Sequence, residues 1–388
     1  MAVLRGDEER VTPLELFFDL VFVLAITQCT ALMAANPTWE GLARGLIVLG
    51  VLWWGWVGYA WLTSVVDPEE GAVRIAIFAA MAALLVAALA VPHAFGNTGL
   101  TFAIAYGFAR YAQVVLLYIA GRDHPSLRHS VITGLSFSTV VAIVLLVIAS
   151  QVDGAAQGAL WVTALALDMA GPLFFGVEGW MLVPAHFAER HGLIVLIALG
   201  ESIVAVGAGA GANLDAGIIT AAILGVVVAA ALWWLYFDVV AVVATRKLAS
   251  ARPGREQNSM ARDSYSFLHL PMVAGIVLVA LGVKKTLGHV DHHLEIVPAT
   301  ALYGGVALYL LALVAFRLRN VHTLNKQRIV TAALLVALLP VVTEIHALVA
   351  LAVLGAVLVS LIAYEAIRFA DARNRIRHEL AREPVAPE

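Results

Sequence analysis

The sequence predicts an all-α fold, a polytopic membrane protein with about twelve transmembrane helices. Of its 388 residues, 62% are hydrophobic and only 13% are charged, whereas ordinary soluble domains carry roughly 25% charged residues. Apolar runs of about 20 residues recur along nearly the whole chain, and each can cross a hydrocarbon core of about 30 Å. The distribution of lysine and arginine supplies a third observation, because it assigns alternating directions to these runs.

The predicted spans follow one another with short polar connections. They cover residues 13–34, 41–65, 73–94, 98–120, 128–151, 157–181, 189–210, 214–243, 264–287, 297–317, 327–343 and 345–368. Only a very short turn within Pro340 to His346 divides the last two. The leader before the first span is acidic rather than basic, so we expect no cleavable signal peptide.

Positive charge gathers on one side of the predicted membrane topology. If the N-terminus is cytoplasmic, twenty of the 24 lysines and arginines fall in inner loops and tails. Cytoplasmic loops carry such an excess of positive charge. We therefore expect both termini and the loop 246–263 to be cytoplasmic.

Two stretches half a chain apart resemble copies of one unit. Each has a Glu-Arg pair followed by a carboxylate within an apolar helix, Asp19 in the first and Glu201 in the second. A Trp-Trp pair begins 34 residues after Asp19 and 32 residues after Glu201, and Tyr106-Gly107 matches Tyr303-Gly304. These ordered matches predict two parallel six-helix repeats, 1–182 and 183–388, the second with a basic C-terminal tail. Chance similarity among helices rich in Leu, Ala and Val is the alternative.

Two motifs carry a resemblance to a known family. They run from Thr12 to Val23 (TPLELFFDLVFV), and through His186 to Gly192 (HFAERHG) with Ala198 to Ser202 (ALGES). Together they closely resemble the bacterial low temperature requirement protein A (LtrA) family, over most of the chain. The resemblance implies a bacterial cytoplasmic (inner) membrane protein. The name of that family records a growth phenotype and implies no settled biochemical activity.

A more distant resemblance suggests a function. The segment from Phe17 to Thr27 is similar to the Phe-Ser-Asp signature that opens each six-helix repeat of the lysosomal and bacterial potassium and proton leak channels. The resemblance implies that the first helix of each repeat lines a pore. It also implies a constriction five residues after the acid, at Leu24 and Val206. The chain departs from the signature because Phe18 replaces the serine.

The buried acids of the two motifs have two interpretations. Glu15 and Asp19 are four residues apart and share one helical face, and Glu201 begins the matching face. Leu24 and Val206 lie about 140° around the helix from the acids. In one interpretation the acids form hydrogen bonds between helices, with tryptophan N–H groups as donors. In the other they form a protonatable site on a substrate path.

Arg110 is the only basic side chain within the middle of a predicted span. Because an arginine stays charged, it needs a carboxylate or a water-filled cavity at that depth. Asp168 is the most central of the remaining acids, and Asp238 and Glu178 lie nearer the inner ends of their helices. The sequence does not decide which of these acids pairs with Arg110.

The excess of deep acids over Arg110 favours a cation or a proton as the transported species. The leading functional prediction is therefore permeation or proton-linked transport of a small cation. The alternative is an intramembrane enzyme acting on a lipid or isoprenoid substrate. We expect no metal site and no cofactor, since Cys29 is the sole cysteine. The net charge of −3 indicates no basic face for nucleic acid. The apolar spans make the lipid bilayer the expected partner. The oligomeric state stays open, a homodimer being one possibility.

Overall fold

The computed structural model describes residues 10–174, 179–210 and 214–371, and every regular element in these ranges is helical. The first half contains α1 (Pro13–Ala35), α2 (Trp39–Val65), α3 (Gly71–Ala90), α4 (Gly99–Ala120), α5 (Pro125–Ser130), α6 (Phe137–Ala149) and α7 (Gly154–Phe174). The second half contains α8 (Pro184–Ala210), α9 (Ala216–Phe237), α10 (Val240–Ser250), α11 (Arg255–Met260), α12 (His269–Gly288), α13 (Ile296–Val321), α14 (Lys326–Ala337), α15 (Leu339–Val342) and α16 (Ala347–Arg368). The π-helical turns Val131–Ser136 and Ala261–Phe267 join α5 to α6 and α11 to α12.

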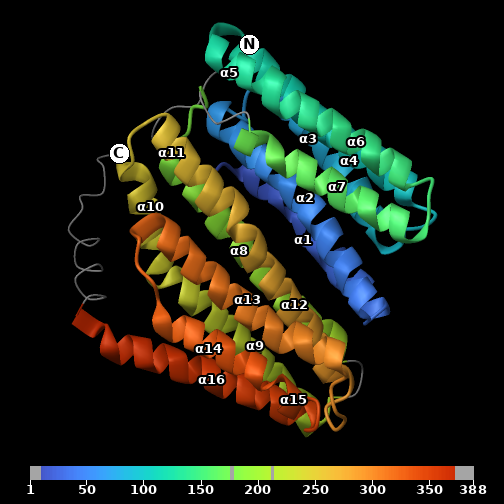
Figure 1. Cartoon of the computed structure of the whole chain (residues 1–388), viewed down its shortest axis with the longest axis vertical. Coiled ribbons are helices and arrows are strands. Elements are labelled where there is room, and N and C mark those ends of the chain that lie inside the picture. The colour runs from blue at the N-terminus through green and yellow to red at the C-terminus, as the bar shows by residue number, and fades with distance from the viewer. Residues whose placement is uncertain (1–9, 175–178, 211–213, 372–388) are drawn as a thin grey trace.

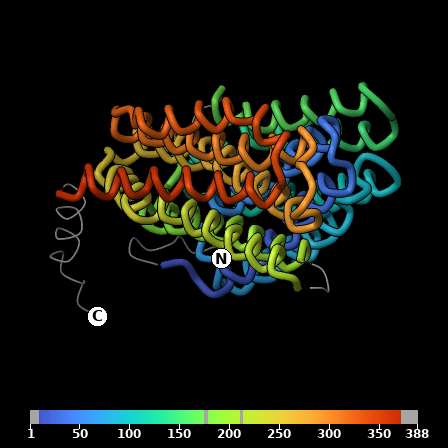
Figure 2. Tube along the Cα trace, turned by 90° about the horizontal axis from the view of Figure 1, so that it is seen from below, coloured from blue at the N-terminus to red at the C-terminus, as the bar shows by residue number. Residues whose placement is uncertain are grey.

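Two groups of helices make up the molecule. Helices α1 to α7 form one group and α8 to α16 the other (Figure 1), and the red helix α16 lies at the outer edge of its group (Figures 1 and 2). Similar pairings recur in the two groups: α1 packs on α2 and α3, and α8 packs on α9 and α12. Likewise α3 packs on α4, and α12 on α13. The duplication of a six-helix repeat and its symmetry stay predictions.

Ten helical stretches of the described chain are long and apolar enough to cross a membrane. The prediction of about twelve spans exceeds this number by two, at α7 and at α14 with α15. Helix α7 has 21 residues, but Gln157 and Asp168 lower its mean hydropathy. Helix α14 has only 12 residues and ends where Leu338 interrupts the run before α15.

Contacts between α1 and α8 support a crossing by α7. Early residues of α1 contact early residues of α8, as Glu15 contacts Arg190, and later ones contact later ones, as Thr27 contacts Glu201. The two helices therefore run parallel, which requires an odd number of crossings between them. Helices α2, α3, α4 and the α5–α6 unit provide four, so α7 is needed as the fifth.

Contacts at both ends of α16 support a crossing by α14 and α15. Arg328, near the start of α14, contacts Glu365 near the end of α16. At the opposite end of α16, the backbone N–H of Ala347 donates to the carbonyl of His292. Helices α14 and α15 thus lead the chain from one end of α16 to the other. Both segments therefore run alongside candidate spans, and the two additional crossings stay a prediction.

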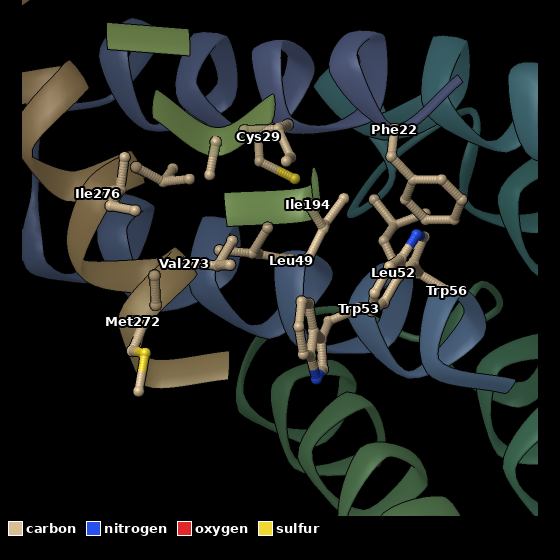
Figure 3. Packing of buried hydrophobic residues seen from close by; sticks show 14 of the residues in the cluster. Phe22, Cys29, Leu49, Leu52, Trp53, Trp56, Ile194, Met272, Val273 and Ile276 are labelled. Carbon is tan, nitrogen blue, oxygen red and sulfur yellow. The ribbon is translucent and has the colours of Figure 1, made fainter. Parts of the chain in front are cut away.

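The two groups meet through an apolar core built by α1, α2, α8 and α12. Phe22, Leu52 and Trp56 lie there with Ile194 and Val273 from the second group (Figure 3). All five side chains are at most 3% exposed. Large apolar side chains on the outer faces of the helices are exposed and suited to contact lipid, among them Ile75, Ile104 and Ile223.

Candidate functional site

Two carboxylates of α1 share one arginine of α8. Arg190 Nη1 donates to Glu15 Oε1 at 3.0 Å, and Arg190 Nη2 donates to Asp19 Oδ1 at 2.6 Å. All three side chains are at most 1% exposed. We call Glu15, Asp19, Arg190 and the neighbouring His186 the cross-half cluster, because its members come from both halves of the chain.

Local sequence positions the first acid of the cross-half cluster. Thr12 caps α1: its hydroxyl accepts from the backbone N–H of Glu15 at 3.3 Å, and the Glu15 carboxylate accepts from the backbone N–H of Thr12 at 2.9 Å. Pro13 begins the helix with its φ already suited to it. This capping box fixes the Glu15 side chain at the first turn, where its Oε1 faces α8.

Helix α2 and His186 complete the surroundings of the two acids. His186 Nε2 lies 2.9 Å from Glu15 Oε1, and the other ring nitrogen of His186 lies 3.3 Å from Ser64 Oγ. Trp56 Nε1 donates to Asp19 Oδ1 at 2.8 Å. The expected tryptophan donor to Asp19 is therefore present, although it is Trp56 rather than a member of the Trp53-Trp54 pair.

With His186 neutral, charge in the cross-half cluster is unbalanced, since two carboxylates then face one guanidinium. Two buried polar atoms of the cluster, Asp19 Oδ2 and Arg190 Nε, have no hydrogen-bond partner among the described residues. The cluster thus has an acceptor oxygen to which a proton can add. Buried polar groups are normally satisfied, so such atoms mark a place for a proton or an ordered water.

A third acid lies further along the same two helices. Glu201 of α8 is 3% exposed and accepts a hydrogen bond from Thr27 Oγ1 of α1 at 2.5 Å. The tryptophan pair expected to serve Glu201 lies elsewhere, because Trp233 and Trp234 are 43% and 39% exposed. Glu201 therefore also connects the two halves, through a hydroxyl instead of an indole.

An apolar layer separates the cross-half cluster from Glu201. On α1 it contains Phe22 and Ile26, which lie between Asp19 and Thr27 in the chain. On α8 it contains Ile194, which lies between Arg190 and Glu201 (Figure 3). Two levels of buried acids thus stand along the α1–α8 contact with hydrophobic packing between them.

Arg110 pairs with Asp168, the most central of the acids that the sequence offered. Arg110 Nη2 lies 2.8 and 2.9 Å from the two carboxylate oxygens of Asp168 and 3.1 Å from Thr139 Oγ1. Its Nη1 donates to Gln113, whose amide in turn donates to the carbonyl of Gly58 at 3.0 Å. This site lies wholly within the first half and contains one positive and one negative charge.

The other predicted site residues are dispersed. Val206 lies against α9 and α12, since a Cβ added at Gly225 would come within 3.0 Å of its Cγ2 and 3.1 Å of Val283 Cγ1. Leu24 is half-buried on α1. Asp238 ends α9 and lines a cavity of about 280 Å³. Glu178 lies outside the described residues, and the constriction at Leu24 and Val206 stays a prediction.

Sequence reasoning missed the role of Arg190 and His186. It used both residues only as part of the family motif and began the span at residue 189, whereas α8 already begins at Pro184. Each of the pairs Glu15/Asp19 and His186/Arg190 has a spacing of four and so occupies one helical face. The first pair is acidic and the second is basic, and the two pairs lie on the first helices of the two predicted repeats. This complementarity was the sequence signal that could have predicted their contact. Among the residues that the structure describes, no group of three or more His, Cys, Asp or Glu suits a metal ion.

Comparisons with known proteins agree with these motifs. The sequence profile of the bacterial low temperature requirement A protein (LtrA) family matches residues 10–363. An uncharacterized protein of Rhizobium meliloti is 29% identical over 305 residues, which cover 73% of this chain and 71% of that protein. No solved structure matches the chain significantly. Because the match spans nearly the whole chain and includes both acid-bearing motifs, this integral membrane protein belongs to the LtrA family.

Proposed function

We propose that this protein carries out proton-linked transport of a small cation across the bacterial cytoplasmic membrane. One observation carries the proposal: two carboxylates share a single arginine in the buried contact between the two halves. With both acids ionised and His186 neutral, the cross-half cluster carries one excess negative charge. A single added proton makes it neutral.

The environment of the cluster gives this proton a large effect. Glu15, Asp19 and Arg190 are shielded from water, and a buried charge without compensation is costly, so the unbalanced state favours uptake of either a proton or a cation. Asp19 Oδ2, which lacks a partner among the described residues, offers the acceptor atom. Competition between a proton and a cation for one excess negative charge is the simplest form of coupling between their movements.

The position of the cluster connects its protonation to the contact between halves. Arg190 reaches from α8 to α1 and α2, donating to Glu15, Asp19 and Thr63. Protonation of either acid weakens its charge-assisted bond to Arg190. In this proposal such a change loosens the contact and lets the helices rearrange, as when domains slide or hinge around a fixed site.

Glu201 and the apolar layer provide the remaining parts of a path. The layer excludes water between the two levels of acids, as hydrophobic constrictions do in channels. Passive permeation through the same contact is the simpler form of the proposal. In that form the apolar layer of Phe22, Ile26 and Ile194 closes the path.

The enzyme hypothesis has less support. Arg110 and Asp168 bond to each other and are 1% and 3% exposed, so neither is available to a substrate. The cavity beside Arg110 measures only about 50 Å³, far smaller than the roughly 300–1,000 Å³ of typical ligand pockets.

Flux through proteoliposomes tests the proposal. We expect the wild-type protein to move H⁺ together with, or in exchange for, K⁺ or Na⁺, and the Asp19→Asn variant to lose the dependence of cation flux on the pH gradient. Glu189→Gln is the matched control, since Glu189 is an exposed acid one residue from Arg190. If no tested cation moves faster than in empty liposomes, or if both variants behave alike, the proposal is wrong.

The proposed orientation has its own test. A cysteine at the exposed position Glu256, in a Cys29→Ser background, should react with a membrane-impermeant thiol reagent only after the cells are opened. Labelling from the outside of intact cells would reverse the orientation of the whole chain.

A further inference from the structure

A cavity of about 280 Å³ lies at one end of the second half, among helices α9, α13, α14 and α16. It lies where α9 and α13 end and α14 begins, and close to the end of α16. Helix ends of this kind stand at the level of lipid head groups. The proposed transport path along α1 and α8 uses none of the residues that line it.

One wall of the cavity is a fixed ion pair. Arg328 Nε donates to Glu365 Oε1 at 2.9 Å and Arg328 Nη2 donates to Glu365 Oε2 at 2.8 Å, a two-pronged geometry. Arg328 Nη1 also donates to the carbonyl of Leu235 at 3.2 Å, which ties the pair to α9. The ion pair therefore gives the cavity a polar wall whose side chains are held in place by three hydrogen bonds.

Two further groups of the lining have bonding capacity that the described chain leaves unused. Asn325 is 4% exposed, and its amide nitrogen donates to Glu365 Oε1 at 3.2 Å, but its Oδ1 has no partner among the described residues. Arg317 is exposed and donates its Nε to Thr323 Oγ1 at 2.9 Å, and no carboxylate of the described chain lies within ion-pair distance of it. The lining thus contains an unused acceptor and a guanidinium that forms no ion pair of its own.

Charge and apolar surface in the lining limit the choice of ligand. The positive charges of Arg317 and Arg328 equal the negative charges of Asp238 and Glu365, so the lining is neutral and suits a zwitterion. Trp234 and Phe369, 39% and 42% exposed, give the cavity an apolar edge open to the surroundings of the bundle. The volume is near the lower end for ligand pockets, about right for a head group and too small for acyl chains.

We propose that this cavity binds the head group of a zwitterionic phospholipid that carries an ammonium donor, of the phosphatidylethanolamine type. The phosphate binds the guanidinium of Arg317, and the ammonium donates to Asn325 Oδ1. The acyl chains leave past Trp234 and Phe369 into the bilayer. The site is independent of the proposed transport function.

Native mass spectrometry of the full-length protein, with added lipids of identical acyl chains, tests the assignment. We expect phosphatidylethanolamine to bind about tenfold more tightly than phosphatidylcholine, which keeps the phosphate but has no ammonium N–H donor. Phosphatidylglycerol, which has hydroxyl donors but a net negative charge, should also bind more weakly. Equal binding of phosphatidylethanolamine with either of the other lipids would overturn the proposal.

Variants and a soluble ligand separate the phosphate contact from general association. Arg317→Gln should weaken phosphatidylethanolamine binding about tenfold. Arg319→Gln is the matched control, because Arg319 lies on the same helix but binds Asp263 at 3.1 Å, outside the cavity. Equal losses in the two variants, or soluble phosphoethanolamine binding as tightly as the lipid, would exclude the proposed lipid site.

Discussion

The two buried charge sites of this protein differ in their balance. Arg110 and Asp168 make a one-to-one pair, supported by Thr139 and Gln113 within the first half. Arg190 instead serves two acids, Glu15 and Asp19, and joins the halves. Each arginine has an Nε without a hydrogen-bond partner among the described residues, so the two sites differ in charge and in the unpartnered Asp19 Oδ2. A charge-balanced pair can remain in a bilayer as a structural element, whereas an unbalanced cluster must take up a proton or a cation to become neutral.

The comparison predicts its largest effect for the loss of Arg190. In the Arg190→Met variant two buried carboxylates lose their only shared cation, which should cost at least about 3–5 kcal/mol of stability. We expect the purified variant to be mostly aggregated in size-exclusion chromatography. A monodisperse variant with the wild-type melting temperature would show that the cross-half cluster does not hold the halves together.

The Arg110 site should behave as a structural pair. Arg110→Met leaves Asp168 buried and unpaired and should cost about 3–5 kcal/mol. The double variant Arg110→Met with Asp168→Leu removes both charges, and we expect it to recover most of that loss, because hydrophobic replacement of a buried pair is often neutral. Thermal unfolding in detergent measures both variants. Failure of the second substitution to restore stability would mean that the pair has a role beyond charge balance.

A smaller effect is expected from the tryptophan that serves Asp19. Trp56→Phe keeps most of the apolar volume but removes the N–H donor to Asp19 Oδ1, and should cost about 1.5–3 kcal/mol. Trp233→Phe is the control in the second half, where the side chain is 43% exposed and should change stability by less than about 0.5 kcal/mol. Melting temperatures that fall equally in the two variants would contradict the assigned hydrogen bond.

The smallest effect on stability is predicted for Glu15→Gln. The substitution removes one of two negative charges, so Asp19 and Arg190 are left as a balanced pair, like the one at Arg110. Glutamine keeps an acceptor for Arg190 but loses one for the N–H of Thr12, a cost of about 1 kcal/mol. The melting temperature should therefore change little while proton coupling is lost. A large fall in melting temperature would instead give Glu15 a mainly structural role.

Periodicity and composition predicted the fold in outline, because every span needs a long apolar helix. The sequence also indicated that Asp19 and Arg110 need partners, but it could not identify them. The partner of Arg110 depends on how α4 meets α7, and the charged partner of Asp19, Arg190, comes from the other half. Such contacts depend on tertiary packing, and no spacing within a single helix encodes them. The matching tryptophan pairs do not serve the two acids alike. Trp56, close to the first pair, donates to Asp19, whereas Trp233 and Trp234 are partly exposed and Glu201 accepts from Thr27 instead.

Proton flux in two matched variants tests the central claim most directly. Glu15→Gln and the double variant Arg110→Met with Asp168→Leu are reconstituted at equal density, and the internal pH of the liposomes is followed after a K⁺ or Na⁺ gradient is applied. The account predicts that the double variant moves protons like the wild type, whereas Glu15→Gln moves none in response to the cation gradient. Proton movement retained in Glu15→Gln but absent from the folded double variant would contradict it.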